Sequence, residues 1–324
     1  MPTTWSEDPV ARVAAGLPLR PVPSPSTRPW AGRRLAAVEA QTGELWLAGP
    51  ASRVPGAGGP SVTLDALAAS CREALVGGRG MALLGARFPL LVKLIDAGDW
   101  LSLQVHPDDD LALELYGPGA VGKTEAWVVL EADPGAVLIT GPRPGLAEAE
   151  LRDAIRDGTL DRDRCEIRPA RPGDVLLLAA GTMHAIGAGA LIYEIEQPSD
   201  LTFRISDWDR PSNPGRPLHP AEALRALRPG ARAVDAGRDW RIDSGALTAA
   251  ELRLELIGPG AVAERSPGGR TAEVVTALAG SATVAGTGWE ERLDRWETLV
   301  IPASAAAYRI RTSETGRACV GSIP

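Results

Sequence analysis

Histidine and lysine, side chains suited to metal binding and to proton transfer, are scarce in this sequence and concentrated in one region. The chain has three histidines, and only two of its 34 basic residues are lysines. Both lysines and two of the histidines lie between Lys93 and His184. Because arginine serves as well as lysine on a solvated surface, a lysine retained against such a bias is expected to act as a compact, flexible point charge. The region therefore indicates a functional site, with Lys93 and Lys123 as candidates.

Four polar side chains in this region have the spacing of a metal site. Side chains two positions apart on a β-strand share a face, so Gln104 and His106 project together. Lys123 and Glu125 do the same on another strand, and the turn after a third strand presents His184. An amide oxygen, a carboxylate and two imidazoles suit a borderline divalent ion, zinc first, with manganese, iron or cobalt as alternatives. An open coordination position and the absence of thiolates are typical of a catalytic metal site.

Other residues of similar chemistry are interpreted as structural. His106 alone, beside a proline, would more often be an ordinary strand-end residue, and only its combination with the other three side chains favours a metal. His219 precedes a proline at a helix start and is expected to cap the helix or to face water. The acidic run 108–110 is expected to form a turn or a helix cap.

Arg204 is a further candidate for chemistry. It alternates with apolar Phe203 and Ile205, so its side chain is expected on the polar face of a strand. If that strand continues the one after His184, the guanidinium points into a barrel. A buried guanidinium is costly unless it meets an anion, and a phosphate or an enediolate would supply one.

Short apolar strands, bounded by Gly, Pro or Asp, must position these side chains. Their pattern is typical of an antiparallel sandwich or barrel. Helical spacing of apolar residues predicts helices over 64–75, 146–160 and 219–230. The first thirty residues are expected to form an extended wrapping segment with little regular structure.

The strand pattern repeats weakly in the second half of the chain. RPGDVLLLAAGTMHAI and DRWETLVIPASAAAYRI share a turn, an apolar strand, a small-residue corner and another strand, with Ala307 or a neighbour in place of the first copy's histidine. We therefore expect a mainly β fold of two β barrels with a few inserted helices. Residues 1–232 are expected to form the catalytic domain with the metal site and the helical inserts, and 233–324 a second domain that lacks metal ligands.

Composition limits the classes of function. A length of 324 residues suits two domains, and three widely spaced cysteines (Cys71, Cys165 and Cys319) provide no disulfide framework or CxxC zinc site. No apolar run has the length of a signal peptide core or a membrane span, so a cytoplasmic protein without a membrane partner is expected. The net charge of -7 argues against a nucleic-acid partner, although a local pocket for a small anion is compatible with it.

The chain resembles the type I mannose-6-phosphate isomerases, or phosphomannose isomerases, in their short two-cupin bacterial form. The resemblance rests on RPWAGRRL, FPLLVKLIDAGDWLSLQVHPDD, GKTEAW, AAGTMHAIGAG and TFRISDWDR, and it spans about the first two thirds of the chain. It implies two cupin-like (jelly-roll) barrels and one zinc ion per chain. It also implies the following roles: zinc ligands Gln104, His106, Glu125 and His184; active-site arginine Arg204; substrate and phosphate pocket Lys93, Lys123 and Ser102.

The resemblance further implies interconversion of mannose 6-phosphate and fructose 6-phosphate through a cis-enediol. The metal would act as a Lewis acid, and Arg204 would stabilise the enediolate charge or orient the intermediate. Lys123 would bind phosphate or shuttle protons. The base stays open between a metal-bound water, Lys123 and Glu196. The only partner expected is a small phosphosugar, and the protein is expected to be a monomer or a homodimer.

The sequence is also compatible with three other functions. Departures from the family pattern at Ala179, Phe203 and Ser206 leave the sugar specificity undecided, so a sister isomerase or epimerase acting on another phosphosugar is one alternative. A metal-dependent oxygenase on the same barrel is a second, although typical oxygenase cupins lack the Lys-x-Glu pair. A sugar-binding or regulatory module is the third, and it predicts affinity without turnover.

Overall fold

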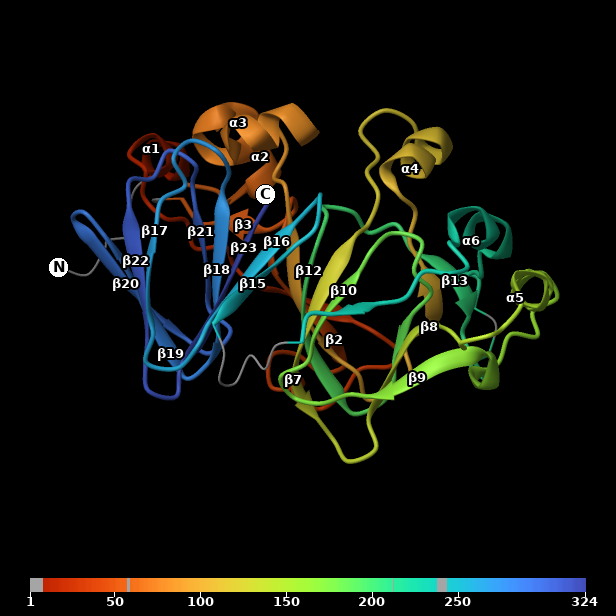
Figure 1. Cartoon of the computed structure of the whole chain (residues 1–324). Helices are drawn as coiled ribbons and strands as arrows, with labels where there is room; N and C mark the ends of the chain where they lie inside the picture. Colours follow the sequence, from red (N-terminus) through yellow and green to blue (C-terminus); the bar gives the residue numbers. More distant parts are fainter. Residues whose placement is uncertain (1–7, 57–58, 212, 238–243) are drawn as a thin grey trace. The chain divides into compact units, whose positions relative to one another are not determined.

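The computed structural model describes residues 8–56, 59–211, 213–237 and 244–324. The chain forms two compact units, neither of which is continuous in sequence (Figure 1). Unit 1 comprises Met1–Ser24, Leu45–Leu94 and Arg238–Pro324, and unit 2 comprises Pro25–Glu44 and Ile95–Gly237. Residues 45–94 therefore group with the C-terminal strands, whereas the pattern of the sequence suggests a single boundary after residue 232.

Unit 2 is organised around a sheet with the strand order β1-β2-β5-β12-β7-β10-β14. Its strands are β1 (Ser24–Thr27), β2 (Thr42–Ala48), β5 (Leu91–Asp96), β7 (Glu125–Ala132), β10 (Val175–Leu178), β12 (Ala190–Glu196) and β14 (Val234–Asp235). Along the chain, β2 and β5 cross the division between the units. Unit 2 also contains the sheet β11-β8-β9 and the pair β13-β6, formed by β6 (Leu103–Val105), β8 (Val137–Pro142), β9 (Cys165–Pro169), β11 (Ala185–Ile186) and β13 (Phe203–Ser206).

Strand β7 is the centre of unit 2 because its sequence is apolar on both faces. Its first six residues, EAWVVL, are all buried, as expected for an interior strand. It pairs antiparallel with β12 on one side, where Glu125 lies opposite Glu196, and with β10 on the other, where Glu125 lies opposite Leu178. An apolar cluster that includes Trp127, Leu138 and Ile192 packs beside it. The glutamate that begins β7 is thereby held inside the unit.

Local sequence signals define the helices of unit 2, which are α4 (Asp109–Tyr116), α5 (Glu148–Arg156), the 3-10 helix η1 (Arg162–Arg164) and α6 (Pro220–Ala226). Asp108 caps α4, since its side chain accepts a hydrogen bond from the Leu111 amide at 3.0 Å. The helix ends at Gly117, whose φ of 84° favours glycine. Helix α6 begins at Pro220, where the missing amide proton costs nothing.

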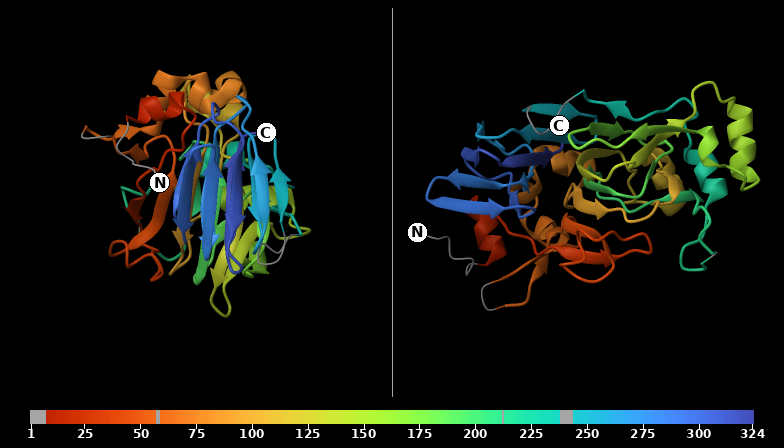
Figure 2. Two further views of the ribbon diagram at one scale, coloured as in Figure 1. Left: turned by 90° about the vertical axis from the view of Figure 1, so that its left-hand side faces the viewer. Right: turned by 90° about the horizontal axis from the view of Figure 1, so that it is seen from below.

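Unit 1 contains two antiparallel sheets with the orders β15-β16-β23-β18-β21 and β17-β22-β19-β20. Figure 2 shows strands of these sheets side by side in blue. Their bounds are β15 (Gly245–Thr248), β16 (Arg253–Ile257), β17 (Val262–Arg265), β18 (Glu273–Ala279), β19 (Ser281–Gly286), β20 (Trp289–Asp294), β21 (Thr298–Ile301), β22 (Tyr308–Thr312) and β23 (Arg317–Ser322). An apolar cluster including Val275, Leu299 and Ile310 forms the core.

The helices of unit 1 are α1 (Pro9–Ala14), α2 (Leu64–Cys71) and α3 (Glu73–Leu84), and a two-strand pair joins β3 (Arg53–Val54) to β4 (Val62–Thr63). The helix expected over 64–75 is broken at Arg72, whose φ of 48° is incompatible with a continuous helix. Thr63 caps the start of α2 by accepting from the Ala66 amide. Apolar spacing thus predicted helix here, but not the backbone break.

The mainly β class is confirmed, and so are helices within 146–160 and 219–230. The strands do not close into hydrogen-bonded barrels, because every sheet formed by the described residues is open and has two edge strands. The first thirty residues are also more regular than expected, since α1 and β1 lie among them and residues 1–7 lie outside the described part. Within the described ranges, no helix has both the length and the apolar character needed to cross a lipid bilayer.

Candidate functional site

Two glycines allow the backbone turns that present the polar residues of unit 2. A Cβ on Gly122 would come within 2.6 Å of the Asp108 carbonyl carbon, so only glycine lets the loop before Lys123 approach that segment. The Lys123 amide donates to the Pro107 carbonyl at 3.0 Å. Gly181, with a φ of 87°, forms the corner before His184. These turns direct Lys123 and His184 inward, and both side chains are buried.

Asp109 holds the same loop from a second side. Its Oδ1 accepts hydrogen bonds from the Gly122 amide at 2.7 Å and from Nε2 of Gln197 at 2.9 Å. Oε1 of Gln197 in turn accepts from the Thr124 amide at 2.8 Å. The acidic run 108–110 therefore caps a helix, as expected, and also joins the loop of Lys123 to the end of β12.

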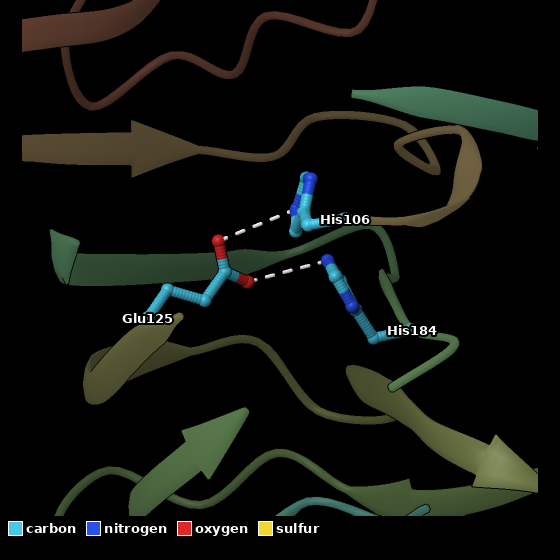
Figure 3. A group of neighbouring side chains, drawn as sticks. All are labelled: His106, Glu125 and His184. Carbon is cyan, nitrogen blue, oxygen red and sulfur yellow. Dashed lines mark ion pairs between the residues drawn. The ribbon is translucent and has the colours of Figure 1, made fainter. Parts of the chain in front are cut away.

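Two imidazoles and one carboxylate meet in unit 2 (Figure 3). Nε2 of His106 lies 3.4 Å from Oε2 of Glu125, and Nε2 of His184 lies 3.2 Å from Oε1. All three side chains are buried, and a set of donor atoms, one from each, lies within 4.8 Å of one another. Three of the four side chains proposed as metal ligands thus form one group that could hold a metal ion.

The main chain orients both rings of this group. Nδ1 of His106 lies 2.8 Å from the Leu201 carbonyl oxygen, and Nδ1 of His184 lies 2.9 Å from that of Thr182. Because a carbonyl oxygen only accepts, each Nδ1 carries the proton and each neutral ring keeps a lone pair on Nε2. A backbone carbonyl behind a histidine is the usual arrangement for a metal-ligating ring.

Burial keeps both imidazoles neutral. It lowers the pKa of His106 to about 3, and the positive charge of Lys123 adds to the effect. Burial also lowers the pKa of His184, although the charge of Glu125 acts in the opposite direction. Neutral rings with their lone pairs facing Glu125 are the protonation states that metal coordination requires.

Gln104 lies at the edge of this group, on β6. It forms an antiparallel bridge with His184, and the two backbones exchange hydrogen bonds of 3.0 and 2.9 Å. Its side-chain nitrogen Nε2 lies 3.1 Å from Nε2 of His184. The amide is thus adjacent to the group, with its nitrogen rather than its oxygen toward the ring. Its role as a ligand remains a proposal that requires the amide to turn.

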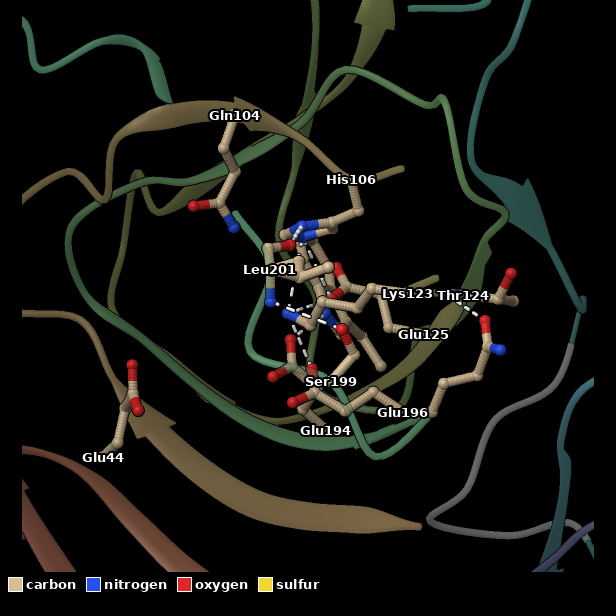
Figure 4. Close-up of polar contacts among 12 residues, drawn as sticks. Glu44, Gln104, His106, Lys123, Thr124, Glu125, Glu194, Glu196, Ser199 and Leu201 are labelled. Atoms are coloured by element: carbon tan, nitrogen blue, oxygen red, sulfur yellow. Dashed lines mark hydrogen bonds and ion pairs between the residues drawn. The ribbon is translucent and has the colours of Figure 1, made fainter. Parts of the chain in front are cut away.

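Lys123 places a fixed positive charge among the carboxylates (Figure 4). Its Nζ lies 2.9 Å from Oε2 of Glu125 and 2.7 Å from Oε2 of Glu196, and only 3% of the lysine is exposed. Burial opposes ionisation of Glu125, but the charge of Lys123 and of neighbouring groups outweighs it and holds the pKa of Glu125 well below its ordinary value. Glu125 is therefore a carboxylate at neutral pH.

Two glutamates of β12 belong to the same neighbourhood, and only one was considered from the sequence. Oε1 of Glu194 accepts a hydrogen bond of 2.8 Å from Nε1 of Trp127, and a second set of donor atoms within 4.8 Å comprises Glu125, Glu194 and Glu196. The alternation E-x-E in 194–196, with Glu196 opposite Glu125, was a signal that could have identified Glu194.

Arg204 lies next to Gln104, since the two residues are paired between β13 and β6. Burial and then the charge of Arg216 lower the pKa of Arg204, although a guanidinium stays charged. Among the described residues, no carboxylate lies within ion-pair distance of this guanidinium. Of the two roles expected for His219, capping of α6 is not seen, because its Nδ1 accepts from the Arg204 amide at 3.1 Å, and the residue is partly exposed.

Ser102 lies in a separate polar network of unit 2. Its Oγ donates to Oδ1 of Asp207 at 2.6 Å and accepts from Nη2 of Arg216 at 3.0 Å. Arg210 also donates to Oδ1 of Asp207 at 2.6 Å. Burial opposes ionisation of Asp207, but the hydrogen bonds from Arg210 and Ser102 lower its pKa to about 2. Arg210 and Arg216 were not singled out from the sequence, which offers no local signal for this pairing.

Lys93 lies on the part of β5 that belongs to unit 1. It is buried, and its Nζ lies 5.9 Å from the centre of the Trp46 ring, within the range of a cation–π contact. Its expected part in the substrate pocket therefore stays a proposal.

The donor set of unit 2 fits a divalent ion. Neutral Nε2 atoms cannot donate to Glu125, so an ion among these three side chains would meet a lone pair from each of them. The carboxylate oxygens of Glu194 and Glu196 lie close to that of Glu125, so oxygen donors suited to a divalent ion are also at hand. The fold and the site thus define a mainly β protein with a buried histidine and carboxylate group that could hold a metal ion.

Comparison with known proteins gives the family resemblance. Residues 34–119 match the catalytic-domain model of phosphomannose isomerase type I. The mannose-6-phosphate isomerase of Streptococcus mutans is 44% identical over 168 residues, which cover 51% of this chain and 50% of that protein. A probable mannose-6-phosphate isomerase of Bacillus subtilis is 41% identical over 145 residues, or 44% and 45% of the two chains. The resemblance inferred from sequence motifs is confirmed, and the matches span about half the length of these relatives.

Solved structures extend the similarity in fold to nearly the whole chain. The mannose 6-phosphate isomerase of Bacillus subtilis is 28% identical, with a TM-score of 0.72 over 94% of this chain and 99% of that one. A putative mannosephosphate isomerase from Archaeoglobus fulgidus is 21% identical, with a TM-score of 0.75 over 94% and 96%. Since the phosphomannose isomerases are cupin folds, the cupin-like architecture is confirmed.

Proposed function

We propose that the protein is a metal-dependent aldose–ketose isomerase that interconverts mannose 6-phosphate and fructose 6-phosphate. The observation that carries the proposal is the buried His106, Glu125 and His184 group with the ammonium of Lys123 beside it. The names of the similar proteins support the choice of substrate. The fourth ligand is Gln104 and the ion is zinc, one per chain, because nitrogen and oxygen donors without a thiolate suit that ion.

The reaction moves two protons. One leaves C2 of the aldose and is returned to C1, and one leaves the hydroxyl on C2 and is added to the oxygen on C1, so that a cis-enediol lies between substrate and product. When bound, the ion supplies Lewis-acid stabilisation of negative charge on the sugar oxygens. Glu196 accepts the carbon-bound proton at Oε2 and returns it to the neighbouring carbon, and the ammonium of Lys123, whose Nζ lies 2.7 Å away, keeps Glu196 a carboxylate between turnovers.

Arg204 stabilises the developing negative charge of the enediolate. Its guanidinium is half-buried beside Gln104 and lacks a carboxylate partner among the described residues, so it can approach an anionic substrate without breaking an ion pair. Ser102 contacts the substrate phosphate, and Lys93 is proposed separately as a substrate-binding residue. Nη2 of Arg216 lies 3.0 Å from the hydroxyl of Ser102 and 3.6 Å from Oδ1 of Asp207, so a guanidinium that could also bind a phosphate lies beside Ser102.

The remaining features of the proposal concern the whole protein. Residues 1–232 carry the catalytic site, and 233–324 form a cupin-like domain that contributes no metal ligand. The protein works in the cytoplasm as a monomer or a homodimer, and its only other partner is a phosphosugar.

The test is metal-dependent turnover. Protein stripped with EDTA is offered mannose 6-phosphate in a coupled assay for fructose 6-phosphate, before and after addition of zinc, manganese or cobalt in separate samples. We expect no activity in the stripped protein and full recovery with zinc. Folded protein that contains one zinc ion per chain but forms no fructose 6-phosphate would refute the isomerase function. The same sample, offered other phosphosugars, would then test an epimerase or a binding module.

A further inference from the structure

Unit 1 repeats the sheet framework that carries the metal-binding group in unit 2. In unit 2, Glu125 begins β7 and lies opposite Leu178, the last residue of β10. In unit 1, Glu273 begins β18 and lies opposite Ile301, the last residue of β21. Both glutamates are buried. Glu273 therefore holds the position in unit 1 that Glu125 holds in unit 2.

Two further positions of the framework correspond in the same way. Gln104 and His184 are opposite one another in an antiparallel bridge, and Arg265 and Tyr308 are opposite one another between β17 and β22. Tyr308, like His184, follows the strand that pairs with the glutamate. The sequence repeat suggested Ala307 or a neighbour for this place, and the register identifies Tyr308.

The fourth position corresponds by spacing. His106 lies two residues after Gln104, and Pro267 lies two residues after Arg265. Both His106 and Pro267 are buried. The sequence of unit 1 has thus replaced each nitrogen or amide donor of the metal set and has kept only the carboxylate.

The replacing side chains converge on that carboxylate. Nε and Nη2 of Arg265 donate to Oε1 of Glu273 at 3.2 and 2.5 Å, and Nη1 lies 2.9 Å from Oε1 of Glu255. The hydroxyl of Tyr308 donates to Oε2 of Glu273 at 2.6 Å. Burial and the charge of Glu273 raise the pKa of Tyr308 well above its ordinary value, so the phenol stays protonated as a donor.

We propose that unit 1 contains a converted copy of the metal site, in which the guanidinium of Arg265 takes the place of the divalent ion. A guanidinium is always charged and, unlike a metal ion, does not have to be taken up from solution. Glu273 therefore has a permanent counterion. The inference concerns unit 1 but rests on the proposed metal role of the group in unit 2. It predicts that replacing the converted side chains by the donors of unit 2 restores a metal site.

The surroundings of the cluster allow such a restoration. Arg265, Pro267 and Glu273 line a groove of about 570 Å³ on unit 1, together with Thr271 and Ser322. An ion in solution can therefore reach the carboxylate once the guanidinium is removed, and an entry path is one of the requirements of a metal site.

The experiment uses the full chain carrying Arg265→Gln, Pro267→His and Tyr308→His, combined with His106→Ala and His184→Ala to remove the imidazoles of unit 2. Zinc content after dialysis and the visible absorption of bound Co²⁺ are the readouts. We expect one ion per chain. The matched control keeps Arg265 and carries only the other four substitutions, and we expect no ion, because the guanidinium still neutralises Glu273. A folded restored variant without an ion, or a control that binds one, would overturn the proposal.

A smaller change tests the same role if the restored variant does not fold. Arg265→Gln should lower the melting temperature of the protein, and Arg265→Lys should recover most of that loss because it keeps a positive charge beside Glu273. A lysine variant no more stable than the glutamine variant would show that charge is not what this position supplies. Absence of an ion from the native protein would instead refute the metal role in unit 2, so the two failures are distinguishable.

Discussion

Nζ of Lys123 lies 2.9 Å from Oε2 of Glu125, two positions further along the chain. Glu125 begins β7, and Lys123 lies in the loop just before it, held by the hydrogen bond from its amide to the Pro107 carbonyl. The carboxylate of the candidate metal group therefore already has one positive partner. Glu196 gives the ammonium a second carboxylate partner, so Lys123 joins two glutamates of neighbouring strands.

Replacement of Lys123 should be costly for stability. Lys123→Met would leave Glu125 and Glu196 buried without their ammonium, and breaking a buried ion pair typically costs about 3–5 kcal/mol. We expect the free energy of unfolding of EDTA-treated protein, measured by urea denaturation, to fall by about 3 kcal/mol. Arg228→Ala is the matched control, because the side chains of its ion pair with Asp108 are 60% and 41% exposed. Loss of such an exposed pair should change stability by about 0.5 kcal/mol or less. Equal effects would contradict the buried-pair interpretation.

Arg204→Ala should separate chemistry from metal binding. We expect turnover to fall by roughly 10²–10³-fold, the usual effect of removing one donor to a developing oxyanion. Zinc content should stay at one ion per chain, because a guanidinium has no lone pair with which to coordinate a metal ion. Arg204→Lys should recover only part of the rate, since lysine cannot reproduce a two-pronged contact. Normal turnover in the alanine variant would remove Arg204 from the mechanism.

The histidines should differ in their effect on metal content. His184→Ala removes one of the nitrogen donors that face Glu125, and loss of zinc during dialysis is expected, as measured by elemental analysis. His219→Ala is the control, because Nδ1 of His219 accepts from the Arg204 amide and His219 is absent from the metal-binding groups of the described residues. That variant should keep its zinc, and equal losses would argue against the assignment.

The charge of Asp207 should stabilise the folded protein near neutral pH but not in strong acid. Its pKa in the folded protein is about 2, below the ordinary value of 3.8, so its contribution is fully present above pH 4 and is lost as the pH falls through 2. Asp207→Asn should therefore lower the urea midpoint at pH 6, and the difference from the native protein should shrink steadily between pH 4 and pH 2. A difference that is constant over that range would mean that the charge of Asp207 contributes nothing.

The three cysteines should react with a thiol reagent at different rates. Burial raises the pKa of Cys165 to about 12, Cys319 is buried, and Cys71 is partly exposed with a pKa also raised by burial. At pH 8, a maleimide reagent should modify Cys71 slowly and leave the other two intact, as read by peptide mass spectrometry. Protein unfolded in guanidinium chloride should react at all three. Modification of Cys165 in folded protein would contradict its burial.

Periodicity predicted the parts of the site that lie on one strand. Alternation places Gln104 with His106 and Lys123 with Glu125, and the structure confirms Lys123 and Glu125 as an ion pair, whereas the side chain of Gln104 contacts His184. The bridge between Gln104 and His184 joins residues 80 positions apart, which no local pattern can specify. The motifs shared with the isomerase family, rather than the strand periodicity, indicated that the three segments form one site.

Other details depend on packing and were not predictable from the pattern. The break at Arg72 divides one expected helix into two, and His219 hydrogen-bonds to β13 instead of capping α6. The repeat in the sequence was weak because only one of four donor positions keeps its chemistry in unit 1. The strand pairing shows the correspondence, because Glu273 and Glu125 each begin a strand and each lie opposite the last residue of the neighbouring strand.

The Leu201 and Thr182 carbonyls that hold the two imidazoles have a genetic consequence. Every amino acid carries the same carbonyl, so no substitution at Leu201 or Thr182 deletes either hydrogen-bond acceptor. Substitutions at these two positions therefore keep the carbonyl oxygens that orient the two rings. Random mutagenesis should accordingly recover metal-deficient alleles at the histidine codons, and rarely at the codons of the residues behind them.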